Sequence, residues 1–198
     1  DLFRLPVTVL DCQTTGASPS KGFLLEMAWT ILLSSEECNL DIHSFLVVQP
    51  AGEPLPGRIT KLTGIKSVMP GEGIADCELA KLLLPALKHT VPIAHFARFE
   101  QRWIDDLYSR CLPDEEIPRI ICTREIARRL YPGLPRKGIR AVSGFMGHSM
   151  EEKKRAAHHV FATVRIWARI VCDLRERGVR NLAQLLDFLA EPLPHCIG

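Results

Sequence analysis

A stretch near the start of the chain decides the fold: Val7–Gly16, which reads VTVLDCQTTG. Its first residues are apolar and mostly β-branched, as in a buried strand, and Gln13 to Gly16 is rich in turn-forming residues. The pattern therefore predicts a strand over residues 7–11. Asp11 would then lie at the tip of that strand, where its carboxylate can take part in a site.

The sequence outward from this stretch predicts an α/β fold. Apolar runs at 23–33 and 44–48 indicate two further strands that follow the first in antiparallel fashion. Strands at 91–95 and 117–122 alternate with helical patterns, which favours parallel pairing. We expect helices at 75–87, 97–111, 124–130, 138–147, 156–177 and 181–190. The predicted architecture is a mixed five-stranded sheet, three antiparallel strands and then two parallel ones, flanked by helices.

The predicted helix at 156–177 has an apolar stripe with near-3.6 spacing, which favours packing on the sheet. The stripe consists of Val160, Phe161, Val164, Trp167, Ala168 and Val171. We interpret these residues as core. We further expect residues 1–178 to form one domain, and 179–198 to be a C-terminal helix and tail that lead into further sequence.

Composition is that of an ordinary globular protein, with 46% hydrophobic and 24% charged residues in 198. No apolar stretch reaches the length of about 20 residues that a membrane-spanning helix needs, and no basic-then-apolar signal segment opens the chain. We therefore expect no membrane partner and a cytoplasmic location. The seven cysteines are scattered without CxxC pairs, which favours reduced thiols.

Net charge is only +2, but residues 118–140 carry seven basic side chains against one acid, Glu125. Such a block can hold a phosphate backbone, but on charge alone we favour the interpretation that it is a solvated helix face. The basic residues are Arg119, Arg124, Arg128, Arg129, Arg136, Lys137 and Arg140.

Four segments, in order, give the chain a family resemblance. Val9–Gly16 resembles the first motif of DEDDh-type 3′–5′ exonucleases, strand-Asp-x-Glu-Thr-Thr-Gly, and residues 93–100, IAHFARFE, resemble the second, His-Asn-x-x-Phe-Asp. Residues 131–135, YPGLP, and 157–163, AHHVFAT, are similar to the Pro-Gly-Leu-Pro segment and the closing His-x-Ala-x-x-Asp helix. Residues 62–65, LTGI, look like a Thr-Gly-Ile element that lies near the substrate. The resemblance covers roughly residues 5–175 and implies a ribonuclease H-like fold, similar to the proofreading subunit of bacterial DNA polymerase III.

In this family, carboxylates hold two Mg²⁺ or Mn²⁺ ions, which prefer oxygen ligands, around a scissile phosphate. The resemblance assigns metal-binding and catalytic roles to Asp11 and Glu100, and the role of general base to His158. An imidazole, with an ordinary pKa of about 6.5, can take a proton from metal-activated water near neutrality.

The other two acid positions of the motifs are occupied by Gln13 and Thr163. Because two carboxylates leave most of the charge of two divalent ions uncompensated, we expect metal binding to be weak or absent and catalysis to be impaired. One alternative is an active or weakly active 3′–5′ exonuclease that uses one tightly bound metal ion or recruits another carboxylate, such as Glu26. A second is a catalytically silent module that binds single-stranded nucleic acid or a protein partner. A third is that one or both replacements were engineered to trap a substrate.

The expected partner is the 3′ end of single-stranded DNA or RNA, with a polymerase or nuclease as a further partner. We expect the cleft residues to converge at the strand ends, with Phe23 and Phe96 as aromatic neighbours for unstacked bases. The nucleic-acid-binding residues that we predict are Thr14, Thr15, Thr63, Phe96, Arg136 and Lys137.

Overall fold

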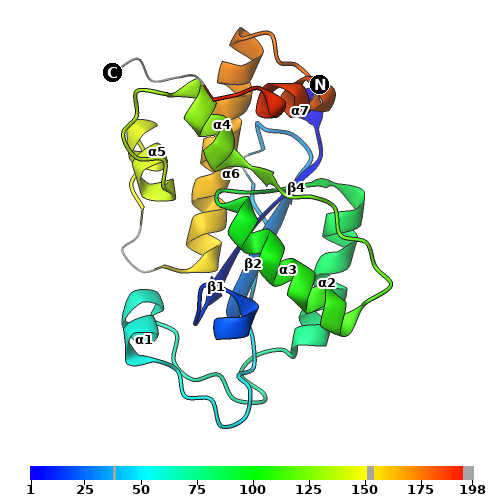
Figure 1. Ribbon diagram of the computed structural model, residues 1–198, viewed down its shortest axis with the longest axis vertical. Coiled ribbons are helices and arrows are strands. Elements are labelled where there is room, and N and C mark those ends of the chain that lie inside the picture. The colour runs from blue at the N-terminus through cyan, green and yellow to red at the C-terminus, as the bar shows by residue number, and fades with distance from the viewer. Residues whose placement is uncertain (38, 151–153, 194–198) are drawn as a thin grey trace.

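A computed structural model describes residues 1–37, 39–150 and 154–193. The chain forms a five-stranded sheet in the order β3-β2-β1-β4-β5 (Figure 1). The strands are β1 (Val7–Thr14), β2 (Leu24–Leu32), β3 (His43–Leu46), β4 (Val91–Ala94) and β5 (Ile121–Cys122). β1–β2 and β2–β3 are antiparallel, whereas β1–β4 and β4–β5 are parallel. The predicted mixed sheet is confirmed.

Helices cover both faces of the sheet. Val7 and Val9 of β1 join the core under α6 (Ala156–Glu176), while Leu10 and Cys12 join the core on the opposite face. This alternation follows from the two-residue period of a strand. The helices α4 (Thr123–Leu130), α5 (Ile139–Phe145) and α7 (Leu182–Ala190) add to the α6 layer, and α2 (Asp76–His89) and α3 (Ala97–Cys111) form the other layer.

β1 is longer than predicted and runs three residues past Asp11. Asp11, Cys12 and Gln13 pair with Ala28, Met27 and Glu26 of β2, so the antiparallel ladder extends the strand. On the other side, pairing with β4 ends at Val9. Asp11 therefore lies beyond the end of β4, where the sheet opens, rather than at the tip of its own strand.

A helix that we did not predict, α1 (Gly57–Thr63), follows the proline- and glycine-rich segment. It ends at Gly64, whose φ of 74° lies in the left-handed region that glycine adopts readily. The Thr63 hydroxyl donates to the Ile59 carbonyl and accepts from the Ile65 amide, which fixes this turn. Two short 3₁₀ helices, η1 (Leu2–Arg4) and η2 (Pro19–Lys21), complete the described elements.

Two further predictions are wrong. Cys77 of α2 and Cys111 of α3 form a disulfide, although we expected reduced thiols, because the two helices pack side by side; Cys12, Cys122 and Cys172 are free. Phe161 is 45% exposed rather than core, and the guanidinium of Arg165 lies over its ring. Of the other residues in the α6 stripe, Val160, Val164, Trp167 and Val171 are fully or nearly fully buried.

Within the described residues, every helix is too short or too polar to cross a bilayer. α7 packs its Leu185 into the α6 core, and the Arg129 guanidinium donates to the carbonyls of Leu189 and Glu191. The boundary that we expect at residue 178 stays a prediction.

Candidate active site

A cavity of about 500 Å³ opens at the end of β4, between β1, α1, α3 and the start of α6. Asp11, Gln13 and Glu100 line it, as do three of the predicted nucleic-acid-binding residues, Thr14, Thr63 and Phe96. We call this cavity the acid cleft. Its other lining residues are Cys12, Ile59, Leu62, His95, Phe99, Arg124, Gly138, Ile139, Lys154 and His159.

Asp11 is 8% exposed, and both of its carboxylate oxygens have partners. Gln13 Nε2 donates to Oδ2 at 2.8 Å, and His159 Nδ1 lies 3.2 Å from Oδ1. Burial raises the pKa of Asp11 above its ordinary value, and the contacts with His159 and Gln13 oppose that rise. An amide thus lies beside Asp11 at the position where the family pattern has a second acid.

Glu100 reaches the cleft from the first turn of α3 and is 3% exposed. Burial, and then the charge of Asp11, raise the pKa of Glu100 well above its ordinary value. Its Oε2 is buried and has no hydrogen-bond partner among the described residues. The two acids of the cleft therefore disfavour each other's ionised form.

Glu26 lies beside Gln13 on the neighbouring strand, but it is fully buried and its carboxylate already accepts hydrogen bonds. It accepts hydrogen bonds from Arg155 Nη2 at 2.6 Å, from the Ala156 amide at 2.8 Å and from the Ser44 hydroxyl at 3.1 Å. These contacts tie β2 and β3 to the start of α6. Glu26 is a structural anchor for the helix in this arrangement and is not one of the residues that line the acid cleft.

His158 and Thr163 are not among the described residues that line the acid cleft. His158 Nδ1 is buried without a hydrogen-bond partner in the described structure, and Thr163 is 1% exposed inside α6. His159 takes the place beside Asp11 that we expected for His158. The sequence shows two adjacent histidines, and only the packing of α6 against β1 shows which of them faces Asp11.

His95 supports the floor of the acid cleft as a neutral ring. It lies between the Thr123 hydroxyl, 3.0 Å from Nδ1, and the Lys137 carbonyl, 2.9 Å from Nε2. Burial lowers the pKa of His95 to about 4. A carbonyl only accepts, so Nε2 carries the hydrogen and Nδ1 accepts from Thr123.

Thr15 lies in the turn between β1 and β2 and is not one of the residues that line the acid cleft. Its hydroxyl accepts from the Phe23 amide at 2.8 Å, and Thr15 and Phe23 line a different hollow. Gly16 lies in the same turn, where a side chain would clash with the Lys21 carbonyl.

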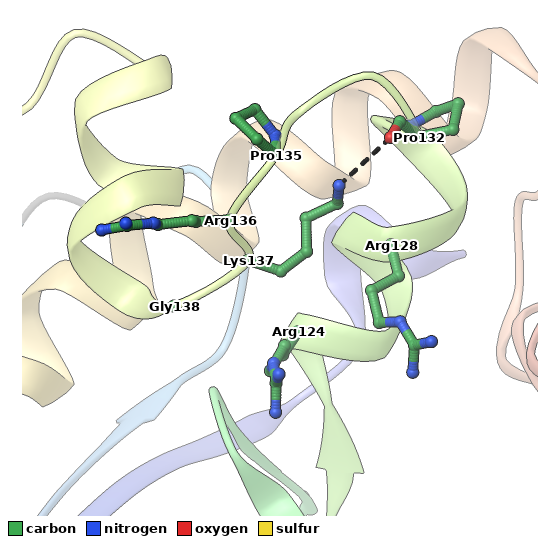
Figure 2. A pocket seen from close by; sticks show the side chains of 7 residues that line it. All are labelled: Arg124, Arg128, Pro132, Pro135, Arg136, Lys137 and Gly138. Carbon is green, nitrogen blue, oxygen red and sulfur yellow. Dashed lines mark hydrogen bonds between the residues drawn. The ribbon is translucent and has the colours of Figure 1, made fainter. Parts of the chain in front are cut away.

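Arg136 and Lys137 line a second cavity of about 600 Å³, which we call the basic pocket (Figure 2). Arg124 and Gly138 line both this pocket and the acid cleft, so the two adjoin. The Lys137 ammonium donates to the carbonyls of Pro132 and Leu134, which ties it to its own loop. Arg136 is exposed, and its side chain extends away from Lys137.

The residues of the acid cleft do not fit a two-ion metal centre. Both oxygens of Asp11 are engaged by donors or by the His159 ring, and the Gln13 amide presents its N–H groups, not its oxygen, to Asp11. Across the described ranges, no three His, Cys, Asp or Glu side chains are grouped to hold a metal ion. The arrangement is instead a hydrogen-bonded polar cluster beside an apolar rim.

The Arg124 guanidinium lies 4.9 Å from the centre of the Phe96 ring, and Phe96 stacks on Phe99. Phe96 is 47% exposed. An exposed ring beside a guanidinium is the kind of surface on which a nucleobase can stack. Sequence reasoning identified Phe96 but not the role of Arg124 at the junction of the two cavities.

No family model matches the chain. The PolC-type DNA polymerase III of Streptococcus pyogenes is 28% identical over 197 residues, which cover 96% of this chain but only 13% of the polymerase.

Solved structures of E. coli exonuclease I share the fold. The complex with a dT13 oligonucleotide has a TM-score of 0.73 at 14% identity, over 92% of this chain and 46% of the other. A zinc-bound form of its complex with single-stranded DNA has a TM-score of 0.71 at 16% identity, over 92% and 45%. The chain therefore has the exonuclease fold of exonuclease I and is similar in sequence to a segment of PolC-type DNA polymerase III.

Proposed function

We propose that this domain binds the 3′ end of a single-stranded nucleic acid in the acid cleft and hydrolyses it slowly or not at all. The fold of exonuclease I and the similarity to a polymerase segment support a 3′–5′ exonuclease ancestry. Phe96 and Phe99 supply stacking surface at the cleft, and Arg124 and Lys154 supply positive charge for a phosphate.

One observation carries the proposal of impaired catalysis: the Gln13 amide donates to Asp11 where a second carboxylate would be needed. Loss of that acid removes both a charge and a ligand from the site that would activate water. The rival hypothesis, an active enzyme that recruits Glu26, is disfavoured because Glu26 is held by Arg155, Ala156 and Ser44.

Mg²⁺ or Mn²⁺ is therefore not needed for binding in this proposal. The similarity to a segment of a polymerase also supports a polymerase partner as a proposal. Exonuclease I, which shares the fold, has a zinc-bound form in complex with single-stranded DNA, so binding in the presence and absence of metal has to be compared.

The test is fluorescence anisotropy with a 5′-labelled oligothymidylate, in EDTA and in Mg²⁺ or Mn²⁺. We expect equal affinity in all three buffers, weaker binding to a circular strand without a 3′ end, and little shortening of the strand. Phe96→Ala should weaken binding about tenfold, in keeping with the 1–3 kcal/mol of one stacked base.

The matched control is Phe145→Ala, because Phe145 is similarly exposed but lies on α5 against Tyr131, away from the acid cleft. It should leave affinity unchanged. Rapid metal-dependent shortening that Asp11→Asn abolishes would show an active enzyme and refute impaired catalysis. Equal binding of linear and circular strands would refute recognition of the 3′ end.

A further inference from the structure

A third hollow, of about 1230 Å³, lies outside the acid cleft along the β5 edge of the sheet. Figure 1 shows α3 and α4, which contribute to its walls, one below the other on the near side of the molecule. We call this hollow the arginine groove. It is defined by Arg98 and Arg102 of α3, Arg119 before β5, and Arg124 and Arg128 of α4.

Positive charge in the arginine groove exceeds negative charge. Asp105 and Glu125 are the acids in its lining. Glu125 is already paired with Arg128 at 3.0 Å and with Arg129 at 3.8 Å. Asp105 accepts a hydrogen bond from Gln101 at 2.9 Å. The Gln101 amide is neutral, so Asp105 keeps its charge, and the lining of the groove holds five arginines against two acids, a net charge of +3.

Arg98 and Arg119 are exposed, and neither pairs with a carboxylate within the ranges that the structure describes. Arg102 donates a hydrogen bond to the Ala17 carbonyl. Because this acceptor is neutral, the positive charge of Arg102 stays uncompensated. Guanidinium groups present planar forks of N–H donors that match phosphate oxygens, and they are less strongly hydrated than ammonium groups. The chemistry of the groove suits a chain of phosphates.

The arginine groove is continuous with the acid cleft. Phe96 and Arg124 line both. A strand whose terminal nucleotide lies against Phe96 could thus leave the cleft past Arg124 and enter the groove without crossing an acidic barrier. The spacing along α3 also suits a linear ligand, since Arg98 and Arg102 lie one helical turn, about 6 Å, apart along the axis.

We propose that the arginine groove binds the phosphate backbone of the single strand upstream of its 3′ end. This inference rests on the proposed function of the acid cleft. The domain then has two contact regions on one strand: a cleft that holds the terminal nucleotide and a groove that holds the phosphates preceding it. Affinity increases with strand length until the groove is filled.

The experiment compares 5′-labelled oligothymidylates of about 4 and about 16 nucleotides, which bracket the site sizes of single-strand-binding domains. The test variant is Arg98→Glu with Arg119→Glu. The control is Arg175→Glu with Arg180→Glu, which changes net charge equally at two exposed positions near the end of α6. Thermal unfolding of each variant verifies that it is folded.

We expect the groove variant to lose at least about tenfold in affinity for the long strand and less than about twofold for the short one. The slope of log affinity against log salt should fall by about 1.4, since each arginine that no longer neutralises a phosphate of a single strand removes about 0.7. The control variant should match the unmodified protein with both strands.

Two results would overturn the proposal. One is that the groove variant binds the long strand as tightly as the control does. The other is that the groove variant loses binding of an acidic peptide while it keeps binding of the long strand, which would assign the groove to a protein partner.

The proposed function of the cleft fails in a different way. If the long strand binds through the groove but Phe96→Ala has no effect on either strand, the acid cleft does not hold the 3′ end. Arg98 and Arg119 line the groove and not the acid cleft, so the groove variant can fail its test without failure of the proposal for the cleft.

Discussion

His159 lies against Asp11 across the space between α6 and β1, with Nδ1 3.2 Å from Oδ1. His158, one residue earlier, has its Nδ1 buried without a hydrogen-bond partner in the described structure. Because a helix turns about 100° per residue, two consecutive side chains cannot both face the same strand. The motif assigns the general base to residue 158, whereas the packing of α6 brings the ring of residue 159 to the acid.

His159→Ala should therefore affect the acid cleft more than His158→Ala. The His159 ring is the group nearest Asp11 that can carry positive charge, and its loss leaves the carboxylate less compensated beside a bound phosphate. We expect a loss of about tenfold in affinity for a 3′-hydroxyl strand at pH 6, and less than about twofold for His158→Ala. Anisotropy titrations of the two variants check this. A larger effect at His158 would mean that the motif alignment, and not the packing of α6, identifies the functional ring.

Much of the fold could be predicted from the sequence, since apolar patterning is local. The limits of α3 agree with the prediction, and those of α2, α4 and α6 differ only slightly. The length of β1 could not be predicted, because Cys12 and Gln13 are strand residues only through their partners on β2. The disulfide between Cys77 and Cys111 depends likewise on how α2 packs on α3.

Residues of the acid cleft could be predicted where their type identifies them. The contacts that depend on the orientation of a side chain could not. Asp11, Gln13 and Glu100 come together as expected. The engagement of Glu26 by Arg155 could not be predicted, since the two lie 129 residues apart in sequence. The hydrogen bonds from the Lys137 ammonium to the carbonyls of Pro132 and Leu134 are local, but they depend on the shape of the loop, which residue type alone does not determine.

Gln13→Glu with Thr163→Asp should restore acids that the site lacks, at a cost in stability. Both positions are buried, at 9% and 1% exposure, and a new carboxylate at residue 13 would lie beside Asp11. Without metal we expect the free energy of unfolding to fall by roughly 2 to 4 kcal/mol, because like charges are buried together.

Mn²⁺ should then raise the melting temperature of the double variant and leave that of the unmodified protein nearly unchanged. We further expect 3′-end hydrolysis to rise more than the two single changes predict together, since the family pattern assigns both positions to one metal site, although Thr163 is not among the described residues that line the acid cleft. Thermal unfolding with and without Mn²⁺, and gel analysis of a labelled strand, measure the two effects. A stable, metal-insensitive double variant would contradict the assignment of residues 13 and 163 to one site.

Arg155→Ala should destabilise the fold more than loss of an exposed ion pair does. Glu26 is fully buried, and Arg155 is its one cationic partner among the described residues. Removing it leaves a buried carboxylate whose remaining hydrogen-bond donors, within the described part of the chain, are the Ala156 amide and the Ser44 hydroxyl. We expect a loss of about 3 kcal/mol in denaturant titrations. Arg169→Ala, which removes an exposed arginine from Asp173, is the control and should cost less than about 1 kcal/mol, because Asp173 keeps its hydrogen bond from Tyr131.

His95 should make the domain less stable at acidic pH. Its pKa is about 4 in the fold, mainly because of burial, against an ordinary value of about 6.5 in the unfolded chain. Between these values the unfolded chain binds the proton more readily, so the contribution of His95 is complete above pH 6.5 and is lost as pH falls toward 4. From pH 7 to pH 5 this loss amounts to about 2 kcal/mol.

Burial raises the pKa of Asp11 and of Glu100, so these two acids make the fold more stable as pH falls, opposite to His95. Their effect on stability has to be separated from that of His95. The comparison of the unmodified protein with His95→Gln does this, because both acids are present in each protein and their contributions largely cancel in the difference. Glutamine can still donate to the Lys137 carbonyl and accept from Thr123, but it does not titrate. The free energy of unfolding of His95→Gln, relative to that of the unmodified protein, should be about 2 kcal/mol higher at pH 5 than at pH 7 in denaturant titrations. A difference that does not change with pH would mean that the buried ring of His95 takes up a proton as readily in the fold as in the unfolded chain.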